Sequence, residues 1–188
     1  MDETIRTDGE AKLAELILYI SQKCASDPKF GAIKLNKILY FSDFIAYGRF
    51  GAAISGVEYS HRAQGPAPTR LLPIRVHLAE KGELLLKKLT LKSGKEQHRT
   101  IALRDPDLSE FSGREIALVD EIIDHLRELD AEESSDFSHQ MVGWKLTEMD
   151  DPIPYGTILL SDEPLSSAEM RRAKELVEIG REKGLPVG

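Results

Sequence analysis

Apolar side chains recur every three or four residues along several stretches of the chain, a spacing typical of helices that bury one face. The first stretch covers residues 10–24. The clearest covers residues 113–129 and follows Ser112 and Glu115, which match a helix-capping box. Weaker versions of the same pattern predict helices over residues 32–47, 70–80, 134–145 and 167–182.

Two of these helices carry expectations about single residues. The hydroxyl of Thr69 is suited to cap the helix over residues 70–80. The helix over residues 134–145 should turn its largest apolar side chains toward the core, and these are Phe137, Met141 and Trp144.

Strand-forming residues occupy 83–91 and 97–103 on either side of the polar run K-S-G-K-E, which predicts an antiparallel hairpin. Its expected buried face consists of Leu84, Leu86, Leu89, Ile101 and Leu103. Residues 54–63 and 155–160 are expected to be extended, and residues 64–68 to form a rigid proline turn.

Helices outnumber strands in this pattern, so the sequence predicts a mostly helical α+β fold: a compact helical domain with a small antiparallel hairpin or sheet. The length of 188 residues fits a single domain over residues 1–188. Its core would span about residues 10–160, and the last helix about residues 167–182.

Composition narrows the class of protein without revealing its function. The apolar runs are far shorter than the ~20 residues of a membrane-spanning helix, so no membrane segment is expected. The single cysteine, Cys24, has no partner for an internal disulfide, which favours a cytoplasmic location.

The net charge of −7 is unevenly distributed, because residues 1–103 carry 16 basic and 11 acidic side chains whereas residues 104–188 carry 9 and 21. Within residues 105–136 there are 12 carboxylates and two arginines. Such asymmetry can steer a charged partner. The acidic side chains that project from the helix over residues 113–129 are Asp120, Glu121, Asp124 and Glu128.

Patterns that would indicate an enzyme are missing from the sequence. The five histidines lack the spacing of metal ligands, and neither a nucleophile elbow nor a phosphate-binding glycine loop occurs. Cys24 lies on an apolar helix stripe, where it acts as a small hydrophobe. The sequence therefore predicts no enzymatic activity, no metal and no cofactor.

The segment K-L-N-K-I-L-Y-F-S-D at residues 34–43 has a residue pattern that core packing alone does not explain. Lys34 and Lys37 could be solvated, could anchor the Gly65-Pro66 turn, or could meet an acidic partner. A three-residue spacing places Tyr40 and Asp43 on one helix face. These two could form a hydrogen bond through the tyrosine hydroxyl, or Asp43 could cap the following loop.

This segment, followed by V-E-Y at residues 57–59 and G-P-A-P at residues 65–68, resembles the pattern of the Panacea antitoxin domain, also called the SocA-like domain. The pair Ser138-His139 and Trp144 resemble the family's closing helix. The resemblance implies a small antitoxin, often encoded beside its toxin, that neutralises this cognate protein toxin by direct contact. It also implies neither a cofactor nor catalysis.

The expected partner surface is built around the second helix and the Gly-Pro turn, and its candidates are Lys34, Lys37, Tyr40, Asp43, Tyr59, Gly65 and Pro66. The acidic residues Asp120, Glu121, Asp124 and Glu128 form a second candidate surface, which would attract a basic toxin site. The oligomeric state is left open.

Two alternatives remain at this point. A nucleic-acid-binding or regulatory protein could place the hairpin lysines on phosphates, namely Lys87, Lys88, Lys92 and Lys95. The acidic net charge disfavours nucleic acid as the main partner. An adaptor that delivers a partner protein to a protease would need only a binding surface, so the sequence does not separate it from simple neutralisation.

Overall fold

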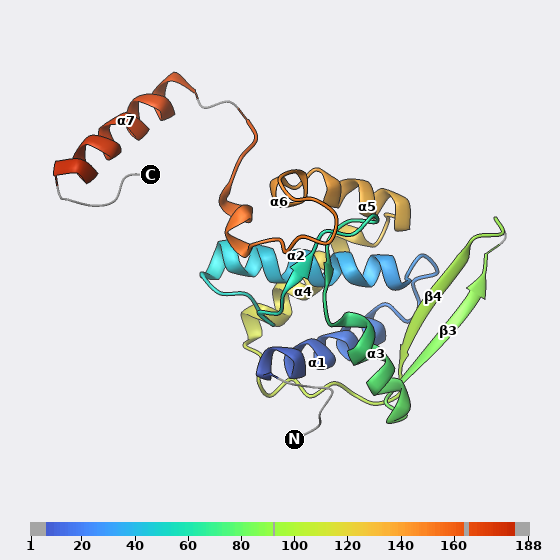
Figure 1. Cartoon of the computed structure of the whole chain (residues 1–188). Coiled ribbons are helices and arrows are strands. Elements are labelled where there is room, and N and C mark those ends of the chain that lie inside the picture. Colours follow the sequence, from blue (N-terminus) through green and yellow to red (C-terminus); the bar gives the residue numbers. More distant parts are fainter. Residues whose placement is uncertain (1–6, 92, 164–165, 183–188) are drawn as a thin grey trace.

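The computed structural model in Figure 1 describes residues 7–91, 93–163 and 166–182. This part of the chain contains seven α-helices, one 3-10 helix and two antiparallel two-stranded sheets. The elements are α1 (Asp8–Lys23), α2 (Ala32–Phe50), β1 (Tyr59–Ser60), β2 (Ala67–Pro68), α3 (Leu71–Glu80), β3 (Leu84–Thr90), β4 (Glu96–Ala102), α4 (Gly113–Leu126), α5 (Ala131–His139), α6 (Val142–Lys145), η1 (Tyr155–Leu159) and α7 (Ser167–Glu182). The predicted mostly helical α+β fold is confirmed. None of the described helices is both long and apolar enough to cross a membrane.

Helix α2 runs through the middle of the molecule, with α1 below it and α5 above it in Figure 1. Side chains on most of its circumference are buried, so α2 lacks the continuous polar stripe of a surface helix. It extends to Phe50, about one turn beyond the prediction. Gly51 then ends the helix in the left-handed conformation, with a φ of 80°.

Helices α1 and α4 confirm the two predicted apolar stripes. At the start of α1 the Thr7 hydroxyl accepts a hydrogen bond from the Glu10 N–H at 3.1 Å. The Ser112–Glu115 capping box forms at the start of α4. The buried faces of both helices join α2 in one hydrophobic core.

The predicted helix over residues 134–145 is wrong in its boundaries, because the segment forms two helices. An Asp130–Glu133 capping box starts α5 earlier than expected. The extended ψ of 136° at Met141 separates α5 from α6. As a result Phe137, which was expected to point inward, is 46% exposed, and Trp144 is half-buried.

The hairpin forms with Leu84 opposite Ala102 and Thr90 opposite Glu96, but its predicted buried face is only partly correct. Leu84 is buried, whereas Leu86 is 37% exposed and Leu103 is 55% exposed. Figure 1 shows the physical reason: the hairpin projects away from the helices, so the core covers only its base.

Three smaller expectations are corrected. Thr69 does not cap α3, because its hydroxyl donates to the Glu58 carbonyl and Arg70 occupies the cap position. Residues 155–160 were expected to be extended but form the 3-10 helix η1 over Tyr155–Leu159. Within residues 54–63 only β1 is a strand. Helix α7 has the predicted bounds and lies apart from the other helices in Figure 1.

Candidate functional site

Asp43 lies on α2, is fully buried, and holds the loop that follows this helix. Its carboxylate accepts a hydrogen bond from the Ser55 N–H at 2.7 Å, a second from the Ser55 hydroxyl, and a third from the Tyr59 hydroxyl at 2.9 Å. Burial raises the pKa of Asp43, and these hydrogen bonds oppose that rise. Of the two alternatives left open by the sequence, the structure shows the loop cap.

Aromatic rings surround this carboxylate. The Tyr40 ring packs against Phe44, with ring centroids 4.3 Å apart, and against Tyr59 at 5.8 Å. Tyr155 of η1 covers Phe44 at 4.6 Å, and its hydroxyl donates to the Val57 carbonyl at 2.6 Å. Burial and the nearby Asp43 raise the pKa of Tyr59 well above its usual range, so its hydroxyl stays a donor.

Lys34 is 1% exposed, and its ammonium group fastens the start of α2 to two other segments. The Nζ atom donates to Asp27 Oδ2 at 2.8 Å and to the Arg127 carbonyl, just beyond α4, at 2.8 Å. A lysine that binds the carbonyls at a helix C-terminus also complements the negative end of the helix dipole. Lys34 is therefore a structural cross-link in this conformation.

Lys37 is completely buried and anchors the Gly65-Pro66 turn. Its Nζ atom donates to the Pro66 carbonyl at 3.3 Å. Burial lowers the pKa of Lys37 to about 7, because the ammonium group has lost its water. Among the three alternatives for the lysines, the anchor of the Gly-Pro turn is the one that this contact supports for Lys37.

Gly65 is required where α2, the turn and α5 approach one another. Its φ of 89° disfavours any side chain. A Cβ atom at this position would lie 2.4 Å from Lys37 Nζ and 2.3 Å from Ser138 Oγ. Ser135 of α5 donates to the Gln64 carbonyl at 2.7 Å. Helix α5 and Lys37 of α2 thus together hold the turn, here called the Gly-Pro loop (residues 62–66).

Trp144 closes the same region by stacking between two histidines. Its ring lies 4.0 Å from His139 and 4.4 Å from His61. Burial and the neighbouring charge of Lys37 lower the pKa of His139, which favours the neutral form of this ring.

These contacts define a set of residues that we call the motif frame: Lys34, Lys37, Tyr40, Asp43, Tyr59, Gly65 and Pro66. All seven are buried, and the fold brings them together around α2. Their side chains are occupied by internal contacts. Direct contact of these residues with a partner stays a prediction. Sequence reasoning missed the contributions of Ser55 and Ser135, since single serines in loops and helices have no distinctive pattern.

The acidic candidates lie along α4 and just beyond it, and three of the four are engaged by nearby basic groups. Asp120 accepts from Tyr19 at 2.7 Å and from Lys23 at 3.0 Å. Arg49 binds Glu121 through two hydrogen bonds, and Arg127 pairs with Asp124 at 2.7 Å. Glu128 is exposed. The acidic surface is thus less negative than its sequence suggests.

A groove of about 1090 Å³ lies between the hairpin, residues 28–33, Gln64 and the first turns of α5. Gln64 of the Gly-Pro loop and Ser135 and Asp136 of α5 form one wall, and Gln97 and His98 of β4 form the other. Near its mouth an exposed ion pair links Lys95 to Glu132 at 3.1 Å. The motif frame therefore positions one wall of a groove that is open to a partner.

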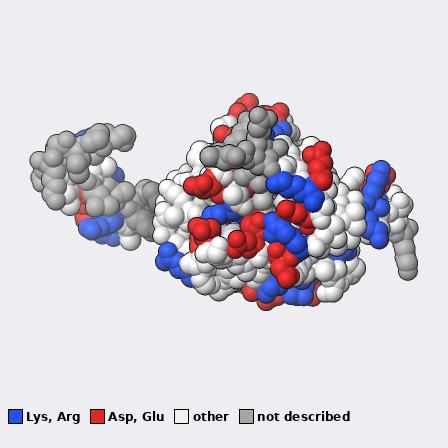
Figure 2. Space-filling view, turned by 90° about the horizontal axis from the view of Figure 1, so that it is seen from below, with Lys and Arg blue, Asp and Glu red and all other residues white. Residues whose placement is uncertain are grey.

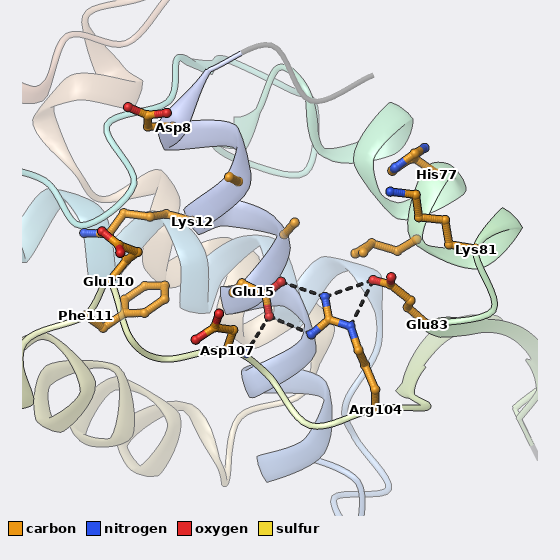
Figure 3. Close-up of a pocket in the computed structure, with 13 residues that line it drawn as sticks. Asp8, Lys12, Glu15, His77, Lys81, Glu83, Arg104, Asp107, Glu110 and Phe111 are labelled. Atoms are coloured by element: carbon orange, nitrogen blue, oxygen red, sulfur yellow. Dashed lines mark hydrogen bonds and ion pairs between the residues drawn. The ribbon is translucent and has the colours of Figure 1, made fainter. Parts of the chain in front are cut away.

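A second cavity, of about 420 Å³, lies between α1, α3 and residues 104–111 (Figure 3). Arg104 bridges Glu15 at 2.6 Å and Glu83 at 2.9 Å, and Glu15 also accepts from the Asp107 N–H at 2.7 Å. These interactions raise the pKa of Arg104, which stays charged and tied to both carboxylates. The cavity is lined by a structural ion cluster.

No group of three or more histidine, cysteine or acidic side chains that could hold a metal ion occurs among the described residues. Cys24 is a buried free thiol whose pKa is raised to about 11 by burial, so it is protonated at neutral pH.

The fold and its buried polar frame define a helical scaffold that presents loops and a groove. The family model described as "Antitoxin SocA-like, Panacea domain" matches residues 35–145, more than half of the chain. The protein therefore belongs to the SocA-like antitoxin family with the Panacea domain. No curated protein and no solved structure gives a match.

Proposed function

We propose that this protein is a cytoplasmic, non-enzymatic antitoxin that neutralises a cognate protein toxin by direct binding. Membership of the SocA-like antitoxin family is the observation that carries the proposal. The position of the family motif supports the proposal, because the charged and hydroxyl groups of the motif hold the helices and the Gly-Pro loop together.

The groove between the hairpin and the Gly-Pro loop is the proposed binding surface. Lys37 and Ser135 both bind backbone carbonyls of the loop region, and Arg62, Ala63 and Gln64 remain exposed on it. A rigid wall loses little conformational entropy on binding, which favours affinity. In this arrangement the motif frame acts on the partner by positioning the groove wall.

The acidic residues of α4 are proposed as an auxiliary surface. Asp124 and Glu128 are exposed and can attract a basic toxin before contact. Their main effect would be on the association rate, because exposed charges are screened by salt.

Co-expression with the protein encoded by the neighbouring gene tests the proposal. The wild-type chain should rescue growth and co-purify with that protein. Asp136→Lys, in the groove wall, should weaken co-purification at least tenfold, whereas Glu80→Lys, an equal charge reversal on the exposed end of α3, should not. Failure of the wild-type chain to bind or rescue would contradict the antitoxin function, and equal behaviour of the two variants would contradict the groove.

A further inference from the structure

Strand β3 has a free edge along the outer side of the hairpin. The hairpin is a sheet of two strands, and no other described strand pairs with it. Figure 1 shows β4 on the side nearer α2 and β3 on the outer side. Natural proteins commonly shield such edges, because an unpaired strand is a template for another chain.

The register identifies which backbone groups point outward. Just beyond the two ends of the strand pairing, the Leu91 N–H donates to the Lys95 carbonyl and the Leu103 N–H donates to the Glu83 carbonyl, both at 2.9 Å. Hydrogen-bonded pairs alternate along an antiparallel ladder, so the odd-numbered residues of β3 face β4. The N–H and C=O groups of Leu86, Lys88 and Thr90 therefore point away from β4. No hydrogen bond among the described residues occupies them.

The side chains along this edge are unusual for a solvent-facing strand. Leu85 is 45% exposed and Leu86 is 37% exposed, so apolar surface lies beside the unused backbone groups. The strand carries Lys87 and Lys88 and no acidic residue, and Lys88 forms an exposed ion pair with Glu96 of β4 at 2.6 Å. Figure 2 shows basic side chains prevailing on the projecting hairpin at the right, whereas acidic and basic side chains are interspersed over the body.

The charge pattern distinguishes between two possible occupants of the edge. If two copies of β3 paired antiparallel over their full length, Lys87 would lie directly opposite Lys87 of the second copy. Like charges directly opposite each other destabilise a strand pair. An extended segment with acidic side chains instead places a carboxylate opposite Lys87, where the second copy would place a lysine.

We propose that β3 is a docking edge on which an extended, acidic segment of the partner protein adds a third strand to the hairpin. Main-chain hydrogen bonds at Leu86, Lys88 and Thr90 supply affinity, and the lysines select the charge of the added strand. The inference rests on the proposed antitoxin function, because the partner is the toxin.

Amide hydrogen exchange measured by NMR on the complex with the neighbouring gene product provides the first test. The Leu86 and Lys88 amides should exchange rapidly in the free protein and at least tenfold more slowly in the complex. The Lys87 and Leu89 amides, already bonded to β4, are internal controls that start protected.

Substitution provides the second test. Leu86→Pro removes an outward N–H without breaking the ladder to β4, and it should weaken partner binding roughly tenfold. Leu86→Ala keeps the N–H and serves as the matched control. Thermal unfolding of both variants checks that the hairpin persists. Lys87→Glu should weaken binding in the same direction, most at low salt.

The outcomes separate the two proposals. Partner binding without new protection at Leu86 and Lys88, or with full affinity for Leu86→Pro, would overturn the docking edge and leave the antitoxin function standing. A partner that does not bind the wild-type chain would overturn both. A dimer of the free protein that Leu86→Pro abolishes would assign the edge to a second copy and likewise overturn the proposal.

Discussion

The motif frame and the hairpin place their lysines in opposite environments. In the frame, Lys34 and Lys37 are buried and donate to carbonyls and a carboxylate of distant segments. On the hairpin, Lys87 and Lys88 are exposed beside backbone groups that have no partner among the described residues. The first region uses its charged groups deep within the fold, whereas the second holds Lys88 only in an exposed pair with Glu96 at 2.6 Å and leaves the outward backbone groups of β3 unused among the described residues.

This contrast separates the buried family motif from the contact surface that we propose on the hairpin. The family motif lies mainly in the frame, where substitution should disturb folding. The hairpin lies between the two motif segments and the closing helix, and it carries no motif residue. Variants that separate stability from partner binding therefore test the comparison directly.

The largest expected effect comes from Lys34→Ala. The change leaves the Asp27 carboxylate, which is mostly buried, without its partner, and it should lower the free energy of unfolding by about 3–5 kcal/mol. Lys95→Ala breaks the exposed Lys95–Glu132 pair and should lower it by less than about 1 kcal/mol. Urea unfolding of both variants measures the difference. Equal losses would show that the two regions do not differ.

A smaller effect is expected for Gly65→Ala. The left-handed φ should cost roughly 1–2 kcal/mol, and the contacts with Lys37 and Ser138 should add roughly 1–3 kcal/mol, because both side chains are buried and have little space to move. Gly82→Ala is the matched control, since Gly82 has a φ of 71° and no atom within 4 Å of the added Cβ. Thermal unfolding should show a larger drop for Gly65→Ala, and identical drops would remove the close approach from the explanation.

The third prediction concerns pH and has a gradual effect. The pKa of Lys37 is lowered to about 7 in the folded state, so between pH 7 and its ordinary value near 10.5 the unfolded chain binds more protons. The stability that depends on neutral Lys37 is therefore complete only above about pH 10.5 and is lost as the pH falls to about 7. It follows that the free energy of unfolding should rise between pH 7 and pH 10, by up to about 1.4 kcal/mol per pH unit.

Lys37→Met should remove this slope while leaving the contributions of other groups in place. His139, whose pKa is lowered by burial and by Lys37, titrates below this range. Parallel pH profiles of the wild-type protein and Lys37→Met, measured by urea unfolding, would contradict a neutral Lys37 in the folded state.

The sequence predicted the features that depend on local periodicity and capping. The stripes of α1 and α4 and the Ser112–Glu115 box are examples, because each is written within one element. Burial of the hairpin face was overestimated, since alternation along a strand does not reveal how far the strand extends beyond the core. The division between α5 and α6 was missed because the Asp130 cap outweighs the apolar spacing on which the prediction relied.

The candidate site shows the same limit. The proximity of Lys37 to the Gly-Pro loop was one of the alternatives that the sequence offered, and the structure shows that contact. The support of Gln64 by Ser135 joins residues 71 positions apart and leaves no mark in either local sequence. The neutralised charges of Asp120 and Glu121 depend on partners in α1 and α2 that could be recognised only once the helices were packed.

The same long-range contacts also have a consequence for the order of events during synthesis. Lys34 binds the Arg127 carbonyl across 93 positions, and the Gly65 turn packs against Ser138. The frame therefore cannot close until α5 has left the ribosome, whereas the helices on which the hairpin packs, α1 to α3, precede it in the chain. A nascent chain would therefore present the proposed docking edge of β3 before the rest of the fold is stable. The chain would stay accessible to proteases until α5 has been synthesised.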